Sequence, residues 1–212
     1  DTLEQVPHRP HWQPVEYNAL HGGMERWFAP MLATTVAQPA WTQLLLALGQ
    51  ICTKLKGSGQ APWYVEAHQF RIDTTDGIGR PTPEGAHRDG VDVVAVFLVG
   101  RQGVKGGETR VFEADGPNGQ RFTLTEPWSL LLLDDARMIH ESTPIQPLKD
   151  GGYRDTLVVT CRRGNFQGAD VVGQAPFVGT LSHRGWRVTD TRLPLLAPGH
   201  DPAIVAQAEV EL

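Results

Sequence analysis

The feature of this chain that most constrains its fold is a series of short segments rich in β-branched and aromatic residues. Gly, Pro, Asp and Asn residues separate these segments. Segments of this kind favour half-buried β-strands, and seven of them at close spacing predict a β-sandwich or barrel. The expected strands are 63–73, 91–99, 109–113, 121–125, 129–133, 138–141 and 156–162.

One helix is expected before the strands. In Trp41–Leu55 apolar side chains recur at near-helical spacing, and Gly57 follows as a C-terminal stop. With 212 residues, 40% hydrophobic and 20% charged, the chain has the size and composition of one globular domain. We expect an N-terminal arm and helix at 1–62, a β core at 63–163 and a C-terminal extension at 164–212. The arm contains one short amphipathic stretch, Tyr17–Phe28.

Charge and hydropathy exclude several classes of partner. The net charge is −5, and the 19 basic residues are scattered, so neither a nucleic acid nor an anionic membrane is expected as a partner. The longest apolar runs, Val93–Val99 and Leu130–Leu133, are far shorter than the roughly 20 residues that span a bilayer. Two cysteines, Cys52 and Cys161, predict reduced core thiols in a soluble, cytoplasmic protein. The oligomeric state stays open.

A His-x-Asp motif and a later histidine suggest a metal site. His87 and Asp89 are two residues apart, so on an extended backbone their side chains leave the same face. His140 follows an apolar strand and an acidic turn, which could bring a second imidazole to the same place. Two imidazoles and one carboxylate on one side of a metal leave the opposite positions open, as in non-haem Fe(II) oxygenases, whereas structural zinc sites are closed. Taken singly, His87 fits a surface turn and His140 a strand end.

Arg154 opens the last apolar strand of the series. An unpaired guanidinium is costly to bury, so an inward-facing Arg154 requires an anion, and its planar fork matches a carboxylate. Thr156, two residues further on, shares its face of the strand. The alternative is that Arg154 forms a salt bridge with Asp150 or Asp155 at the rim.

These residues, in this order, resemble the Fe(II)/2-oxoglutarate-dependent dioxygenases. The resemblance rests on His87-x-Asp89, the GGET block at 106–109, the LLLLDD and HESTP blocks around His140, and Arg154-x-Thr156. It covers about 63–163. The EGAHRDGVD segment, with HQFR before it and YRDTLVVT after it, is most similar to the branch that hydroxylates free amino acids such as isoleucine and leucine, or N-substituted derivatives of them. The resemblance implies a mainly β fold with flanking helices, the double-stranded β-helix, also called the jelly roll or cupin-like fold.

Carried over to this sequence, the resemblance assigns roles to five residues. It implies that His87, Asp89 and His140 hold Fe(II), and that Arg154, helped by Thr156, receives the distal carboxylate of the co-substrate 2-oxoglutarate. O2 is the second co-substrate, and succinate and CO2 are the co-products. Because related halogenases replace the carboxylate ligand with a small residue, Asp89 favours hydroxylation over halogenation. The resemblance also implies a small-molecule substrate. A desaturase or oxidative cyclase on the same scaffold is the alternative reaction, and a non-catalytic jelly-roll binding module is the alternative class.

Three further residues are candidates for binding the substrate. Gln69 and Arg71 share one face of the first expected strand, and Arg88 lies between two of the proposed metal ligands. We expect them to contact polar groups of the substrate or co-substrate. For Gln69 and Arg71 the alternative is that their face points outward while the alternate residues of the strand face the core.

Overall fold

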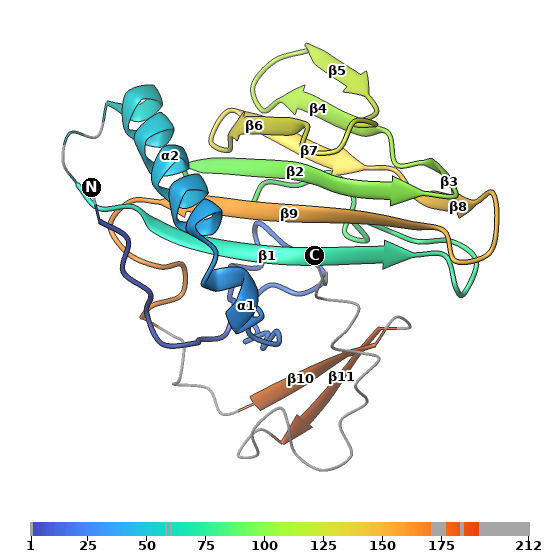
Figure 1. Cartoon of the computed structure of the whole chain (residues 1–212), viewed down its shortest axis with the longest axis horizontal. Helices are drawn as coiled ribbons and strands as arrows, with labels where there is room; N and C mark the ends of the chain where they lie inside the picture. Colours follow the sequence, from blue (N-terminus) through green and yellow to red (C-terminus); the bar gives the residue numbers. More distant parts are fainter. Residues whose placement is uncertain (1, 58, 60, 171–176, 183–184, 191–212) are drawn as a thin grey trace.

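The computed structural model describes residues 2–57, 59, 61–170, 177–182 and 185–190. Within these ranges the chain forms two helices and eleven strands (Figure 1). The helices are α1 (Ala33–Val36) and α2 (Pro39–Lys56). The strands are β1 (Tyr64–Asp73), β2 (Val93–Gln102), β3 (Val104–Gly106), β4 (Thr109–Glu113), β5 (Gly119–Phe122), β6 (Leu130–Asp134), β7 (Met138–Ser142), β8 (Ile145–Pro147), β9 (Tyr153–Arg162), β10 (Phe177–Ser182) and β11 (Gly185–Asp190).

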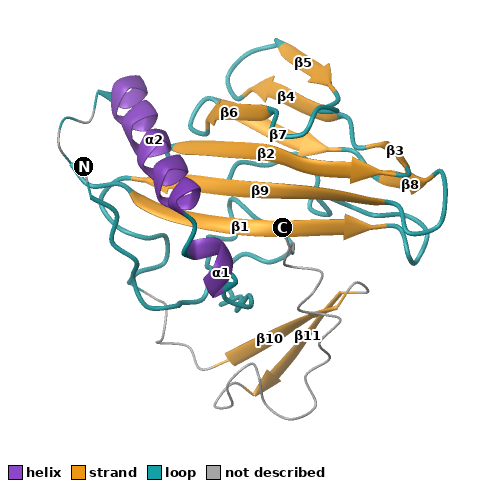
Figure 2. Ribbon diagram, in the orientation of Figure 1, coloured by secondary structure: helices purple, strands orange, loops and turns teal. Residues whose placement is uncertain are grey.

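Two antiparallel sheets form the body of the fold. The larger sheet has the strand order β1-β9-β2-β6, and the smaller one has the order β5-β4-β7. Two further pairs, β3 with β8 and β10 with β11, are also antiparallel. Figure 2 shows α2 lying across one face of the larger sheet. The fold is mainly β and corresponds to the jelly roll that the resemblance implies.

Strand β9 is buried on both of its faces. Leu157, Val159 and Cys161 point toward α2 and pack in one apolar cluster with Leu48 and other residues of that helix. Val158 points the opposite way and packs against a second cluster, in which β2, β4 and β6 meet. Because successive side chains of a strand alternate between faces, β9 has a continuous apolar sequence and separates the helix-covered face from the interior of the jelly roll.

The predicted elements agree with the observed ones to within about three residues at most ends. Helix α2 spans Pro39–Lys56, and Gly57 ends it in the left-handed conformation (φ +61°), where its N–H donates to the carbonyl of Thr53. The prediction misses α1, β3 and β8, which have three or four residues each and are too short to show a period. The seven expected strands also do not include β10 and β11 of the C-terminal extension. No helix in the described part of the chain is long and apolar enough to cross a membrane.

The N-terminal arm contains no helix at Tyr17–Phe28. This stretch instead forms turns and folds back, so that His11 and Arg26 pair as an antiparallel bridge with N–O distances of 2.8 Å in both directions. Two glycines permit the reversal: a Cβ on Gly22 would overlap backbone atoms of the same loop, and Gly23 has a φ of +77°. Amphipathic spacing therefore does not produce a helix here.

Leu48→Ala should lower the free energy of unfolding by about 2–5 kcal/mol, because Leu48 is 2% exposed and the change leaves a cavity under α2. Leu55, in the same helix, is 61% exposed, and Leu55→Ala should change stability by less than about 0.5 kcal/mol. Urea unfolding of both variants measures the difference. Equal losses would contradict the packing of α2 on the larger sheet.

Candidate metal centre

A backbone bridge brings the His-x-Asp motif beside β7. The N–H of His87 donates to the carbonyl of His140 at 3.0 Å, and the N–H of His140 donates back at 2.9 Å. The Nε2 atom of His87 then lies 3.7 Å from Oδ1 of Asp89, and Nε2 of His140 lies 3.8 Å from Oδ2. One potential ligand atom from each residue falls within 4.8 Å of the other two. This spacing fits a single ion bound by three side chains.

Hydrogen bonding fixes the tautomer of His87. Its Nδ1 atom lies 2.8 Å from the carbonyl oxygen of Gly85, so Nδ1 carries the proton and donates it. The lone pair of Nε2 then faces Asp89. A backbone carbonyl that orients a ligating imidazole is a common outer partner of metal sites, and here it leaves the nitrogen that faces the carboxylate free to bind an ion.

The charges of the site favour a cation. Burial opposes ionisation of Asp89, but the neighbouring imidazoles of His87 and His140 lower its pKa to about 2. Burial also opposes protonation of His87, yet Asp89, Glu84 and the Gly85 carbonyl raise its pKa to about 9. Burial lowers the pKa of His140. The ionised carboxylate of Asp89 therefore favours a proton on the imidazole of His87, and a bound metal ion would displace that proton.

Asp135 holds the loop that carries Asp89. Its buried carboxylate accepts hydrogen bonds from the N–H groups of Asp89 (2.9 Å), Gly90 (2.7 Å) and Val91 (3.1 Å). Gly90 has a φ of +78°, and a Cβ there would lie 2.5 Å from the ring of Tyr17. Our sequence analysis did not single out Asp135. Its only sequence signal is an acidic residue directly after an apolar strand.

The N-terminal arm reaches the same carboxylate from the other side. The buried Gln13 donates from Nε2 to Oδ1 of Asp89 at 3.1 Å. Its own oxygen accepts from Nη2 of Arg26 at 2.7 Å and from Nδ2 of Asn18 at 3.1 Å. The amide of Gln13 is thus fixed in orientation by the arm, and it orients Asp89 in turn. The sequence carries no signal for this contact.

Arg154 lies buried on β9, where 4% of its surface is exposed, and the neighbouring Thr156 is also buried. No carboxylate of the described residues lies within 4 Å of Arg154, so the predicted alternative, a rim salt bridge with Asp150 or Asp155, does not form. Its Nε is buried without a hydrogen-bond partner in the same residues. Burial and the nearby Arg101 lower its pKa to about 10, which leaves it charged at neutral pH. A buried, unpaired guanidinium fits the carboxylate of an acidic ligand.

Gln69 and Arg71 lie on the opposite face of the sheet from Arg154. They pair in register with Leu157 and Asp155 of β9, whose side chains alternate with that of Arg154. The guanidinium of Arg71 donates two hydrogen bonds to Asp155, at 2.9 and 2.7 Å. The structure therefore does not bring these two residues to the site, and the outward-facing alternative describes them.

Arg88 is also held away from the metal ligands on either side of it. Its Nη1 donates to the carbonyl of Ala136 at 3.1 Å, and its guanidinium lies 5.6 Å from the ring centroid of Tyr17. The strand alternation that places His87 and Asp89 together turns Arg88 the other way. The structure does not bring Arg88 together with the two metal-ligand candidates.

Asp135→Asn should weaken Fe(II) binding by about 10–100-fold, the usual range for loss of an outer partner of a metal site, because an amide offers one acceptor oxygen instead of two. Asp134→Asn is the matched control, since Asp134 bonds Lys56 at 2.6 Å and none of the three N–H groups that Asp135 holds. Anaerobic calorimetry with Fe(II) measures both. A change in Asp134→Asn as large as that in Asp135→Asn would show a general loss of structure instead.

Comparison with known proteins gives the family. The family model described as 2OG-Fe dioxygenase matches residues 1–160, and a model of a domain of unknown function matches residues 135–211. No curated protein matches the chain. The crystal structure of a bsmA homolog from Methylobium petroleophilum is 62% identical, with a TM-score of 0.74 over 78% of this chain and 67% of that one.

A more distant similarity supports the fold alone. The Fe(II)/α-ketoglutarate-dependent dioxygenase TqaL is 19% identical, with a TM-score of 0.50 over 68% of this chain and 62% of its own. The family match extends from the arm into β9 and includes every candidate ligand described above. The chain therefore belongs to the 2OG-Fe dioxygenase family and is an oxygenase that depends on Fe(II), 2-oxoglutarate and O2.

Proposed function

We propose that this oxygenase hydroxylates an unactivated C–H bond of a free amino acid or amino-acid derivative. The observation that carries the proposal is the convergence of His87, Asp89 and His140 within 4.8 Å, on a chain that also buries an arginine with no acidic partner in the described residues. We assign the three convergent side chains to Fe(II). We assign Arg154, with Thr156 beside it, to the distal carboxylate of 2-oxoglutarate.

The chain's own part in this chemistry is to bind and to orient. When bound, the iron and the keto acid supply the oxidising power, with succinate and CO2 as co-products. His87 presents Nε2 because Gly85 holds its Nδ1 proton. Gln13 fixes one oxygen of Asp89 at 3.1 Å. The buried strand β9 holds the guanidinium of Arg154 in surroundings where a charge-assisted bond to a carboxylate is strong.

Two alternatives on the same scaffold have distinct signatures. A desaturase or oxidative cyclase would yield a product lighter by two hydrogens, whereas hydroxylation adds one oxygen. Asp89 supports hydroxylation over halogenation, because its carboxylate occupies the position that a halide would need. A non-catalytic binding module is disfavoured, because packing alone does not call for a buried ionised carboxylate between two histidines.

We also propose that the arm, the jelly-roll core at 63–163 and the C-terminal extension at 164–212 form one dioxygenase domain. Gln13 supports this for the arm, because its bond to Asp89 joins the arm to the core. Residues 171–176, 183–184 and 191–212 of the extension lie outside the described residues. A cytoplasmic location is proposed from the two free, buried cysteines, Cys52 and Cys161.

Anaerobic addition of Fe(II) and then 2-oxoglutarate should produce the weak visible charge-transfer band of a chelated keto acid. Arg154→Ala should weaken 2-oxoglutarate binding at least about tenfold and leave Fe(II) binding unchanged, because only the charge-assisted contact is lost. Arg121→Ala is the control, since Arg121 is exposed on β5. A wild-type band that persists undiminished in Arg154→Ala would refute the co-substrate assignment.

A panel of free and N-acylated amino acids should contain a substrate whose product is one oxygen heavier. His87→Ala should abolish this product, because a two-ligand site holds Fe(II) poorly, and its circular dichroism spectrum should match that of the wild type. Mass spectrometry of the products is the measurement. Turnover confined to peptides or terpenoids would refute the substrate class and leave the cofactor assignment standing.

A further inference from the structure

Strand β1 presents two polar side chains to the interior of the jelly roll. In the antiparallel register with β9, Ile72 lies opposite Arg154, His68 opposite Val158 and Glu66 opposite Thr160. Directly opposed residues of an antiparallel pair point to the same face. Glu66 and His68 therefore share the face of the larger sheet that carries Arg154, not the helix-covered face.

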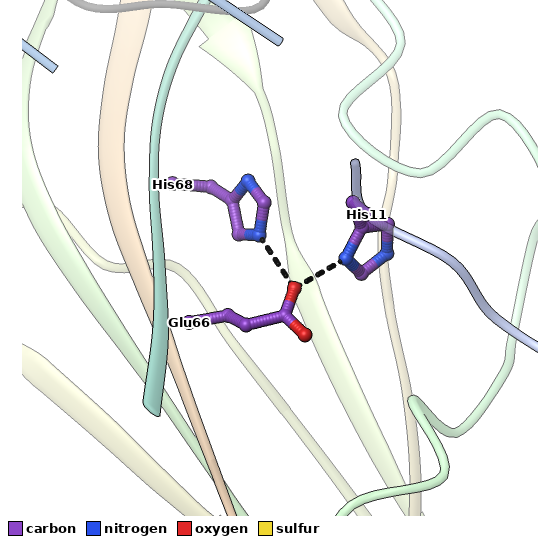
Figure 3. A group of neighbouring side chains, drawn as sticks. All are labelled: His11, Glu66 and His68. Atoms are coloured by element: carbon purple, nitrogen blue, oxygen red, sulfur yellow. Dashed lines mark hydrogen bonds and ion pairs between the residues drawn. The ribbon is translucent and has the colours of Figure 1, made fainter. Parts of the chain in front are cut away.

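The carboxylate of Glu66, which is partly buried, lies between two imidazoles (Figure 3). Its Oε2 lies 2.7 Å from Nδ1 of His11, which belongs to the arm, and 3.5 Å from Nε2 of His68. Burial lowers the pKa of His11, which keeps this imidazole neutral, whereas both histidines together lower the pKa of Glu66 far below its usual range. No lysine or arginine in the described residues lies within 4 Å of Glu66, and Nε2 of His68 is buried without a hydrogen-bond partner there. Glu66 is thus a carboxylate without a lysine or arginine at contact distance in the described residues.

Arg26 is the opposite charge on the neighbouring part of the arm. It pairs with His11 in the backbone bridge, so the two side chains leave the arm on the same side. Its Nη2 donates to Gln13, and Gln13 donates to Asp89, so a single amide separates this guanidinium from a metal ligand. Its Nε is buried without a partner, and no carboxylate lies within 4 Å of it in the described part of the chain. Glu84, Asp89 and Glu66 act on it from further away.

We propose that Arg26 and Glu66 bind the α-carboxylate and the α-ammonium group of the substrate. The inference rests on the proposed function and narrows it to amino acids with both groups unmodified. A guanidinium fork matches a carboxylate, and the carboxylate oxygens of Glu66 offer acceptors to an ammonium group. Arg154, which is buried, and Arg26, which is partly buried and bonded to Gln13, then have parallel roles: neither has a carboxylate within 4 Å in the described residues, and one would bind the co-substrate and the other the substrate.

A second metal ion is the competing occupant of this cluster. His11, Glu66 and His68 also place ligand atoms within 4.8 Å of one another. Two features favour the ammonium group. The 2.7 Å separation of His11 Nδ1 and Glu66 is that of a hydrogen bond with the proton between the two atoms, and the charge of Arg26 acts on Glu66 and would repel a divalent cation more strongly than a monovalent one.

The test measures substrate binding without oxygen, to enzyme loaded with Fe(II) and 2-oxoglutarate. Binding is followed by the shift of the charge-transfer band. The proteinogenic amino acids are titrated first, and the tightest binder is compared with its amide and its N-acetyl derivative. We expect Arg26→Gln to weaken binding of the free amino acid at least about tenfold and binding of the amide less than about twofold. We expect Glu66→Gln to weaken binding of the free amino acid at least about tenfold and binding of the N-acetyl derivative less than about twofold. Tenfold corresponds to about 1.4 kcal/mol.

Two exposed residues give matched controls, and four kinds of outcome overturn the proposal. Arg121→Gln and Glu126→Gln should bind all three ligands as the wild type does. Arg26 would have a structural role if Arg26→Gln weakened binding of the amino acid and of its amide equally. Glu66 would have a structural role if Glu66→Gln weakened binding of the amino acid and of its N-acetyl derivative equally. A band that forms but that no amino acid shifts would refute both this proposal and the substrate class, whereas absence of the band would refute the cofactor assignments beneath them. Two Zn(II) ions per wild-type chain, with one lost in Glu66→Gln, would make the cluster a metal site.

Discussion

The partly buried, ionised carboxylate of Asp89 is the group around which the site is built. Asp135 holds its backbone through three N–H groups, Gln13 holds its Oδ1, and two imidazoles face it. Keeping such a charged carboxylate away from water costs free energy unless a cation neutralises it. A second buried carboxylate close by adds to that cost, since Asp89 together with burial raises the pKa of Asp135. The arrangement is consistent with a site that is complete only when it binds a metal ion.

Three arginines show how the same side chain takes different roles in one sheet and its arm. Arg71 is satisfied by the bidentate contact with Asp155 and joins β1 to β9. Arg154 is one residue from Asp155 on β9 but points to the other face, where no acidic side chain of the described residues reaches it. Arg26 is held by a neutral amide, not by a carboxylate. Pairing within the protein thus distinguishes a structural arginine from one left available to a ligand.

Some of the candidate site residues were accessible to sequence reasoning because their signals are local. His87 and Asp89 are two residues apart, and Arg154 opens a strand whose apolar alternation is visible in the sequence. Alternation along a strand shows only which residues share a face. It does not show which face of β1 points to the interior. The pairing with β9 decides this, and it places Gln69 and Arg71 outside and Glu66 inside. Gln13, Arg26 and Asp135 act through contacts with residues far along the chain, for which a single sequence carries no periodic signal.

The proposed roles of Arg26 and Glu66 link substrate binding to the docking of the arm on the core. At this point the arm makes two hydrogen bonds to the core, Gln13 to Asp89 at 3.1 Å and His11 to Glu66 at 2.7 Å, and the ring of Phe28 packs edge-on against His68 and Phe70 of β1. Net contributions of such hydrogen bonds are about 0.5–1.5 kcal/mol each, with larger values for charged partners, so these two bonds alone hold the arm only modestly. Because Arg26 lies on the arm and Glu66 on β1, a ligand that contacts both adds its binding energy to the docked arm. A ligand lacking either charged group would add less, so under the proposal above the contacts that select the substrate also favour the docked arm.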